Sequence, residues 1–267
     1  MRTDPMVALR RTSFVAPGGR RSIIAPSKMV QRTPYGLNIV ESCLACPFRQ
    51  ERLFCNLSSP ALEFLSSITK SGTYPKGAAL FVEGQEPRGV FILCSGRAKL
   101  SSSSPAGKTL IFRIAQPGEV LGLSATISGK PYQVTAELFE PSQVSFISRE
   151  PFLRFMRERG EVACKVAEEL SRTCNAVFAE VLSLGLGARA SEKLARLLLD
   201  LSENQHKGKS EARIKLTLTY EEMGQMIGIS RETVTRLVAT FRKRQLVQIK
   251  GSTLIVRRAA LENLFRT

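Results

Sequence analysis

The sequence predicts an α+β fold, and three observations lead to that class. Short β-prone runs separated by glycines fill residues 58–148, a long apolar helical pattern follows to about residue 184, and residues 217–256 have the pattern of two short helices and a β-hairpin. We therefore expect a basic arm over 1–38, a β domain with a cysteine-containing lead-in over 39–148, a connecting helix over 149–186, and a C-terminal domain over 187–267.

The β domain is predicted from turn spacing. Turn residues recur every eight to twelve positions between β-rich runs, as in barrels and sandwiches. A brief helix is expected first, starting at Ser58 or Ser59. The expected strands then cover Ala79–Val82, Val90–Leu93, Ala98–Leu100, Leu110–Ile114, Val134–Leu138 and Val144–Ile147.

One long helix is predicted from Glu150 to about Leu184. Its apolar residues alternate in steps of three and four, the spacing of a coiled-coil seam between two copies of a chain. The alternative is a helix packed on its own domain. Gly185 and Gly187 then interrupt the pattern and are expected to form a hinge. The seam consists of Val162, Val166, Leu170, Thr173, Val177, Val181 and Leu184.

The segment from Thr217 to Val256 predicts a helix-turn-helix unit followed by a hairpin. Thr219 and Glu222 have the spacing of a capping box, Gly228 can end the first helix, and Ser230 can cap the second. The second helix has an inward stripe at helical spacing. That stripe consists of Val234, Leu237, Val238 and Phe241.

Packing does not account for the outward residues of this second helix, Arg231, Glu232, Thr235 and Arg236. In helix-turn-helix proteins the start of the second helix meets base edges in the DNA major groove. Arginine can donate two hydrogen bonds to guanine, and glutamate can accept one from cytosine. We therefore predict base reading here, with Ser230 beside it and Lys250 of the hairpin wing near the phosphates. The alternative is a solvated charged face.

The net charge of +16 is concentrated outside the middle of the chain. Residues 187–267 carry sixteen Lys and Arg against eight acids, whereas residues 36–186 carry sixteen against fourteen. This distribution favours nucleic acid as a partner over a membrane. The sequence has no apolar run long enough for a membrane span and no apolar signal core, so we expect a cytoplasmic protein with reduced thiols. The only histidine, His206, falls in a polar loop and is expected to be exposed.

Three cysteines, Cys43, Cys46 and Cys55, form the only cluster of metal-ligand residue types in the lead-in. Thiolates two residues apart can bind zinc or an iron of a cluster, but both normally need four ligands. Cys94 could be a fourth, although its strand context favours a buried thiol. A cluster, zinc and redox or relic thiols therefore remain open. Cys164 and Cys174 are expected to be packing residues on the long helix.

Residues 219–242, and GISRETVTR in particular, resemble the DNA-binding helices of the Crp/Fnr family. The phrases KGAALFVEGQEPRGVFILCSGRAKL and PGEVLG resemble the cyclic-nucleotide-binding β-roll of the same family. The resemblance implies a β-roll sensor, a dimerisation helix and a winged helix-turn-helix. It also implies a non-enzymatic transcription regulator that binds palindromic DNA as a homodimer and works with RNA polymerase. Arg231, Glu232 and Arg236 match positions that contact bases in the family.

The same resemblance bears on the signal. In the anaerobic-regulator branch, three N-terminal cysteines and one from the β domain hold a [4Fe–4S] cluster. Here the gap between the second and third cysteines is longer than in the best-known members, and Ser145 stands at the fourth position.

For cAMP the family uses an acid and an Arg-Ser pair, whereas this chain has Leu123 and Tyr132-Gln133. Lys130 lies nearby but lacks the forked donor geometry of arginine. We expect no family-type cAMP site.

Two rival functions are weighed. One is a cyclic-nucleotide-binding module whose ligand switches DNA binding, or which lacks DNA activity, and it would need the missing acid and arginine. The other is an enzyme of nucleotide or redox metabolism. The sequence contains no phosphate-binding loop, no histidine placed for catalysis and no pair of nucleophile and base. Both are less well supported than a DNA-binding regulator.

Overall fold

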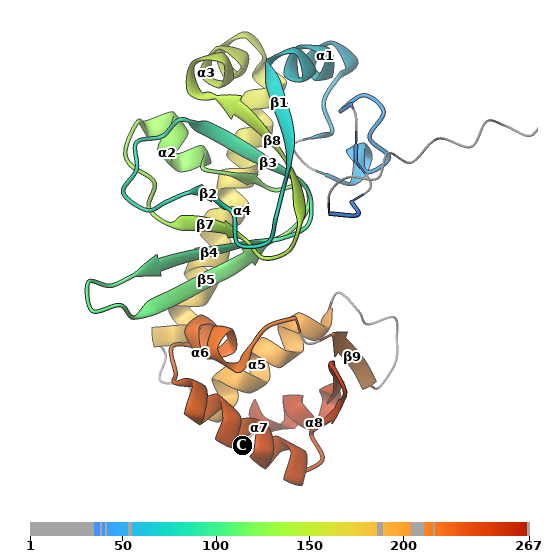
Figure 1. The fold of residues 1–267 in the computed structure, drawn as a ribbon, viewed down its shortest axis with the longest axis vertical. Coiled ribbons are helices and arrows are strands. Elements are labelled where there is room, and N and C mark those ends of the chain that lie inside the picture. Colours follow the sequence, from blue (N-terminus) through green and yellow to red (C-terminus); the bar gives the residue numbers. More distant parts are fainter. Residues whose placement is uncertain are drawn as a thin grey trace, which may run out of the picture. The chain divides into compact units, whose positions relative to one another are not determined.

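The structure is a computed structural model of the chain. It describes residues 35–265 apart from 38, 41, 53–54, 186–188, 204–210 and 216. The basic arm predicted over residues 1–38 lies almost wholly outside the described residues, as do most of the predicted hinge and His206. The predicted α+β class is confirmed, with two β-sheets and a helical layer in the N-terminal part and a helical domain with a third sheet in the C-terminal part (Figure 1).

Two four-stranded antiparallel sheets form the β-roll. The first has the order β1-β8-β3-β6 and the second the order β2-β7-β4-β5. The strands are β1 (Thr69–Tyr74), β2 (Ala79–Phe81), β3 (Gly89–Ser95), β4 (Ala98–Ser103), β5 (Thr109–Ala115), β6 (Val120–Leu121), β7 (Thr135–Leu138) and β8 (Ser142–Ser148). The predicted strands are all present, whereas β1 and β6 were not predicted.

Alternation along β3 assigns its two faces to two different cores. Phe91 and Leu93 pack with the core between the two sheets. Val90 and Ile92 pack with a second core that includes residues of α1 (Ser59–Ile68) and α3 (Arg149–Glu158). Because side chains on a strand alternate between faces, Cys94 lies on the same face as Ile92, and it does pack against that second core. The short helices η1 (Arg49–Glu51) and α2 (Leu123–Ser128) complete this part of the chain.

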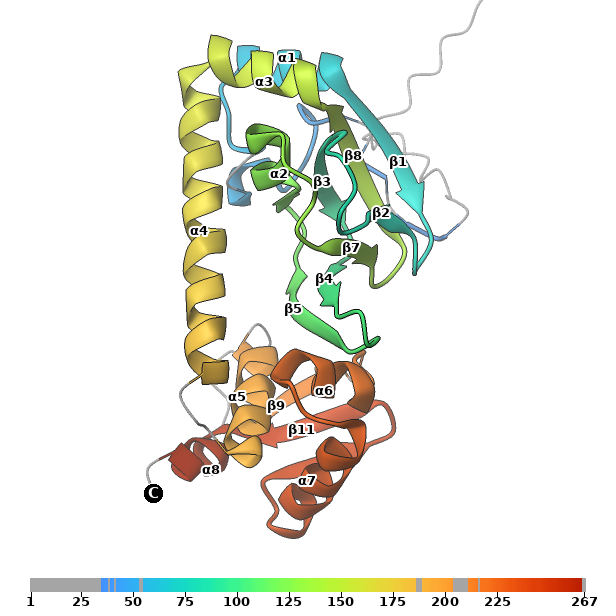
Figure 2. The ribbon, with the colours of Figure 1, turned by 90° about the vertical axis from the view of Figure 1, so that its left-hand side faces the viewer.

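The predicted single helix over 149–186 is wrong, because the structure has two. After α3 ends, Arg159 adopts an extended backbone with φ −132° and ψ 96°, and α4 (Gly160–Gly185) begins at a glycine. Figure 2 shows the two helices meeting at an angle. The break allows α3 to cover one end of the first sheet while α4 runs on as a separate helix.

The predicted seam of α4 is divided between two environments. Val162 and Val166 are fully buried in the core that also holds Phe152 and Phe155 of α3. This first part therefore packs on its own domain, which is the alternative interpretation of the pattern. Further along, Phe178 is 62% exposed. The side chains of the last two seam residues, Val181 and Leu184, are outside the described set.

The C-terminal domain has the order helix, strand, two helices, hairpin and terminal helices. Its largest buried side chains include Leu194 and Phe241. The predicted helix-turn-helix and wing are both present. The elements are α5 (Ala190–Glu203), β9 (Glu211–Lys215), α6 (Tyr220–Ile227), α7 (Arg231–Lys243), β10 (Val247–Lys250), β11 (Thr253–Arg257), α8 (Arg258–Glu262) and η3 (Asn263–Phe265).

Strand β9 was not predicted. It pairs with β11 and makes the wing a three-stranded sheet of order β10-β11-β9. Among the helices of the described residues, none combines the length and the apolar character needed to cross a membrane.

Candidate functional site

The turn between α6 and α7 is fixed by caps and by one close backbone approach. Thr219 and Glu222 form a reciprocal capping box at the start of α6, and Gly228 ends this helix in the left-handed region with φ 70°. A Cβ at Gly224 would lie 2.6 Å from the Ile229 carbonyl oxygen. Glycine is therefore required there, because any side chain would push the two helices apart.

Helix α7 presents a polar row from its first turn and a half. The Ser230 hydroxyl accepts a hydrogen bond from the Thr233 amide and caps the helix. Val234, Val238 and Phe241 are buried in the domain core. The residues that point away from this core are all exposed, and they are Arg231, Glu232, Thr235 and Arg236.

Hydrogen bonding keeps the Glu232 carboxylate charged. Its own backbone amide, the Ser230 hydroxyl and, more weakly, the Arg231 guanidinium lower the pKa of this exposed carboxyl. An ionised carboxylate is only an acceptor of hydrogen bonds. The row therefore offers two donors of the guanidinium type around one acceptor. In the wing, Lys250 is exposed next to the hairpin turn at Gly251.

An apolar cavity of about 510 Å³ lies between the β-roll and α4. Leu123, which occupies the position of the family's ribose-binding acid, is buried and lines it. Tyr132, at the position of the family's phosphate-binding arginine, is also buried. Its ring stacks on Phe81 at 4.1 Å between centroids, and its hydroxyl donates to the Gly89 carbonyl at 2.8 Å. Neither side chain is available to bind a cyclic phosphate.

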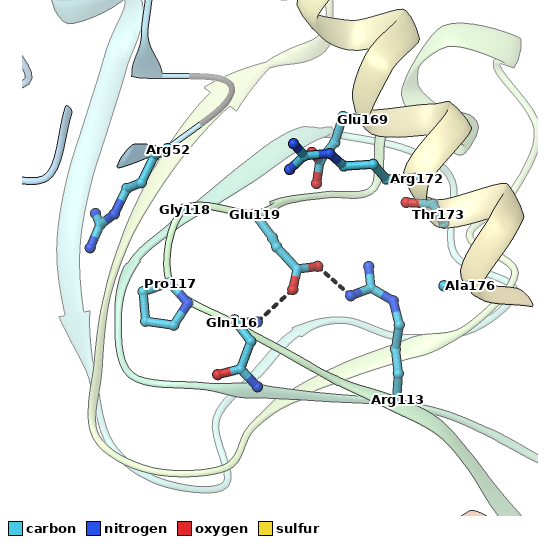
Figure 3. A pocket seen from close by; sticks show the side chains of 10 residues that line it. All are labelled: Arg52, Arg113, Gln116, Pro117, Gly118, Glu119, Glu169, Arg172, Thr173 and Ala176. Atoms are coloured by element: carbon cyan, nitrogen blue, oxygen red, sulfur yellow. Dashed lines mark hydrogen bonds and ion pairs between the residues drawn. The ribbon is translucent and has the colours of Figure 1, made fainter. Parts of the chain in front are cut away.

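A second cavity, of about 340 Å³, is lined by charges from three segments (Figure 3). Glu119 accepts hydrogen bonds from the Gln116 amide at 2.7 Å and from the Arg113 guanidinium. Glu169 and Arg172 line the cavity from α4. Arg52 lines it from the cysteine-containing lead-in, with its guanidinium directed away from Glu119. The sequence interpretation missed this cluster, although an acid within the apolar stripe of α4 was a signal for it.

The buried acid in this cluster gives a pH-dependent prediction. Glu169 is 5% exposed, and burial, followed by the charge of Glu119, raises its pKa. A raised pKa favours the protonated form in the fold, so stability falls as pH rises above the normal value of 4.5. We expect Glu169→Gln to raise the thermal midpoint at pH 7, with a smaller gain near pH 4. Calorimetry at both pH values would measure this, and a lower midpoint at pH 7 would contradict it.

The three lead-in cysteines are half-buried and lie near one another and near Cys94. Burial raises the pKa of Cys43 to about 11 and that of Cys55 to about 12, and the charge of Cys94 adds to both shifts. The pKa of Cys94 is also raised by burial, with a smaller contribution from Cys46. Cys43, Cys55 and Cys94 also pack against the same apolar core of the β-roll. Among the described residues, no three His, Cys, Asp or Glu stand in an arrangement for a single metal ion.

The other two cysteines, Cys164 and Cys174, were predicted to be packing residues. Both are exposed on α4 in the single chain, so that prediction is wrong for the described structure.

Comparison with known proteins assigns both domains. A family described as cyclic nucleotide-binding domain matches residues 72–159, and a family described as Crp-like helix-turn-helix domain matches residues 192–264. The chain is 28% identical over 214 residues to the transcriptional activator protein Anr of Pseudomonas aeruginosa, covering 78% of this chain and 86% of that protein. It is 24% identical over 210 residues to a CRP-like cAMP-activated global transcriptional regulator of Mycobacterium tuberculosis, covering 76% of this chain and 91% of that protein.

Among solved structures, FixK2 from Bradyrhizobium japonicum has the same fold. Its TM-score is 0.65 at 21% identity, and the match covers 74% of this chain and 97% of FixK2.

Proposed function

The chain belongs to the Crp/Fnr family of DNA-binding transcription regulators, and from this premise we propose that it reads palindromic promoter sites as a homodimer under control of an oxygen or redox signal. A sensor domain and a Crp-like helix-turn-helix domain are both present. The site of control would be the lead-in cysteines, and the site of DNA reading would be the start of α7.

The polar row on α7 carries the DNA-reading part of the proposal. Arg231 and Arg236 can each donate two hydrogen bonds to a guanine, and Glu232 between them can accept from a cytosine amino group. The side of the helix opposite the row is held by the buried Val234 and Phe241, so the row has a fixed direction. Ser230, Thr235 and Lys250 would add contacts to the DNA, Lys250 through phosphates.

The exposed apolar part of α4 supports the dimer in this proposal. Val177 and Phe178 are 47% and 62% exposed in the single chain, and large apolar side chains on a helix are commonly covered by a partner. Two-fold symmetry would place two copies of α7 in major grooves about one helical turn (~34 Å) apart. The complex would then recruit RNA polymerase in the cytosol.

We propose that the cysteine thiols of the lead-in detect the signal and that cAMP is not the effector. The buried Leu123 and Tyr132 remove the acid and the forked donor that a cyclic nucleotide needs. The lead-in thiols Cys43, Cys46 and Cys55 supply the donors that bind an iron–sulfur cluster such as [4Fe–4S]. When bound, such a cluster supplies redox and oxygen reactivity. The protein's own contribution is to hold the thiols half-buried beside the β-roll.

A selection experiment tests DNA reading without knowledge of the target genes. We expect the full-length protein to enrich a palindrome from a random duplex library. Arg231→Ala and Arg236→Ala should each weaken binding to that palindrome by ~1–3 kcal/mol, which is roughly 5- to 150-fold, and should relax the preference at one base pair per half-site. Competition gel shifts would measure both effects.

Arg242→Ala is the matched control for this experiment. Arg242 is an exposed arginine in the last turn of the same helix, so it has the same charge but lies away from the polar row. Its loss should leave the base preference unchanged. If Arg231→Ala weakened binding to scrambled DNA as much as binding to the palindrome, the residue would contact phosphate and the base-reading proposal would fail.

A further inference from the structure

Cys94 occupies an irregular position in the β-roll. The pairing of β3 with β8 shifts register between Leu93 and Ser95, so Cys94 is an extra residue in the ladder. Its sulfur lies 3.2 Å from the Ser145 hydroxyl oxygen on β8. A bulge re-aims a side chain and is common next to functional sites. Here it packs against the apolar core that Cys43 and Cys55 of the lead-in also contact.

The first attachment of the lead-in segment lies beside this bulge. The buried Gln143 side chain donates to the Val40 carbonyl at 2.7 Å and accepts from the Val40 amide at 2.8 Å. Gln143 pairs with Ser95, the residue after Cys94. Three residues of extended chain span at most about 10 Å, so Cys43 is held within reach of Cys94.

The second attachment lies on the other side of the cysteine segment. The Arg52 side chain packs against Gly118, where an added Cβ would lie 2.6 Å from its Cγ. The Gly118 amide donates to the Leu93 carbonyl at 2.7 Å, which places this turn next to Cys94. The Cys55 amide in turn donates to the Arg52 carbonyl at 3.0 Å. Arg52 thus attaches the chain just before Cys55 to the turn beside β3, whereas Val40 attaches the chain just before Cys43.

We propose that Cys94 is the fourth protein ligand of an iron–sulfur cluster whose other ligands are Cys43, Cys46 and Cys55. The inference rests on the proposed redox control. It assigns the fourth ligand to Cys94, whereas the family pattern would place that ligand at position 145, which is a serine here. Cys43, Cys55 and Cys94 pack against the same apolar cluster, although Cys94 lies 39 residues beyond Cys55 in the sequence. Cys94 on β3 lies beside Ser145 on the neighbouring strand β8, so it can present a sulfur close to the position that the family uses.

Among the described residues, the thiols do not form the closely spaced set that a single metal ion needs. A tetrahedral zinc site requires sulfurs about 3.8 Å apart, given a bond of ~2.3 Å. Cys43, Cys55 and Cys94 pack against one apolar cluster, but the described residues offer no set that close together. In a four-iron cluster each thiolate binds its own iron, so the thiolates stand further apart. Each thiol would release its proton to solvent as it binds.

Iron and sulfide analysis of the full-length protein tests the assignment. The protein would be reconstituted without air with sulfide and with equal amounts of ferrous and ferric iron, which together supply the oxidation level of the cluster. Iron and acid-labile sulfide would then be measured per chain. We expect about four of each for the unaltered protein, as for a [4Fe–4S] cluster, and loss of both to background for Cys94→Ala. Cys164→Ala removes an exposed thiol from α4 and should keep the full content.

A relocation variant separates loss of a ligand from loss of fold. Ser145→Cys in the Cys94→Ala background returns a thiol close to the lost sulfur, and we expect it to restore iron and sulfide. Full iron content in Cys94→Ala would overturn the assignment, as would a single zinc or no iron in the unaltered protein. Failure of the relocated thiol to restore iron in a natively folded variant would overturn the placement between β3 and β8. DNA binding by iron-free protein is measured separately, so a failed cluster and a failed regulator give different results.

Discussion

Replacing Phe178 with glutamate is expected to convert the proposed dimer into monomers. Burying a phenylalanine contributes ~1.5–3 kcal/mol, and a two-fold interface contains the residue twice. The expected loss is therefore about 3–6 kcal/mol, which corresponds to a dissociation constant raised by roughly 10²- to 10⁴-fold. Sedimentation across a range of protein concentrations would measure it. Affinity for a full palindrome should fall in parallel.

Val82→Glu is the control for this change. Val82 is an exposed apolar residue of the β-roll that lies outside α4, so the same chemical replacement leaves the proposed interface intact. The variant should remain dimeric. If Phe178→Glu also remained dimeric at low concentration, α4 would not be the dimer contact. Binding of the polar row to a two-fold DNA site would then require a dimer contact elsewhere in the protein.

Phe241→Ala is expected to destabilise the C-terminal domain by ~3–5 kcal/mol, because a fully buried ring leaves a cavity when it is removed. Phe241 is 1% exposed at the centre of the core that supports α7. Urea unfolding monitored by hydrogen exchange of the α7 amides would report this domain separately from the β-roll. Thr240→Ala, at the exposed neighbouring position, should change the free energy of unfolding by no more than ~0.5 kcal/mol. Equal protection in both variants would show that the core does not support α7.

Local chemistry made the helix-turn-helix domain predictable. The capping box joins residues three apart, and the inward stripe of α7 repeats every three or four residues, so both can be found in a short window. The exposure of Arg231 and Arg236 follows from that periodicity. The burial of Leu123 and Tyr132, by contrast, could not be inferred from the two residues alone, because it depends on the packing of the β-roll.

Features that depend on distant parts of the chain were not predictable from pattern. The break at Arg159 separates two apolar helical patterns that are continuous in sequence, and only packing on the β-roll shows that α3 and α4 differ in direction. The sequence left Cys94 open as a buried thiol or a fourth ligand, and the bulge at this position has no reliable local pattern. Its relation to Cys55 depends on the packing of Arg52 against Gly118, which are 66 residues apart.

The way in which Gln143 holds Val40 constrains length more than composition. The Gln143 carboxamide has both a donor and an acceptor, as a peptide unit has. It hydrogen-bonds only the main-chain atoms of Val40, so the side chain at position 40 does not take part. Almost any amino acid could therefore stand at position 40. An insertion or deletion between positions 40 and 43 would have a larger effect. The hydrogen bonds between Gln143 and residue 40 would remain, but the cysteine sulfurs that follow would be displaced. The number of residues between positions 40 and 43 is therefore constrained, whereas most of their side chains could be replaced.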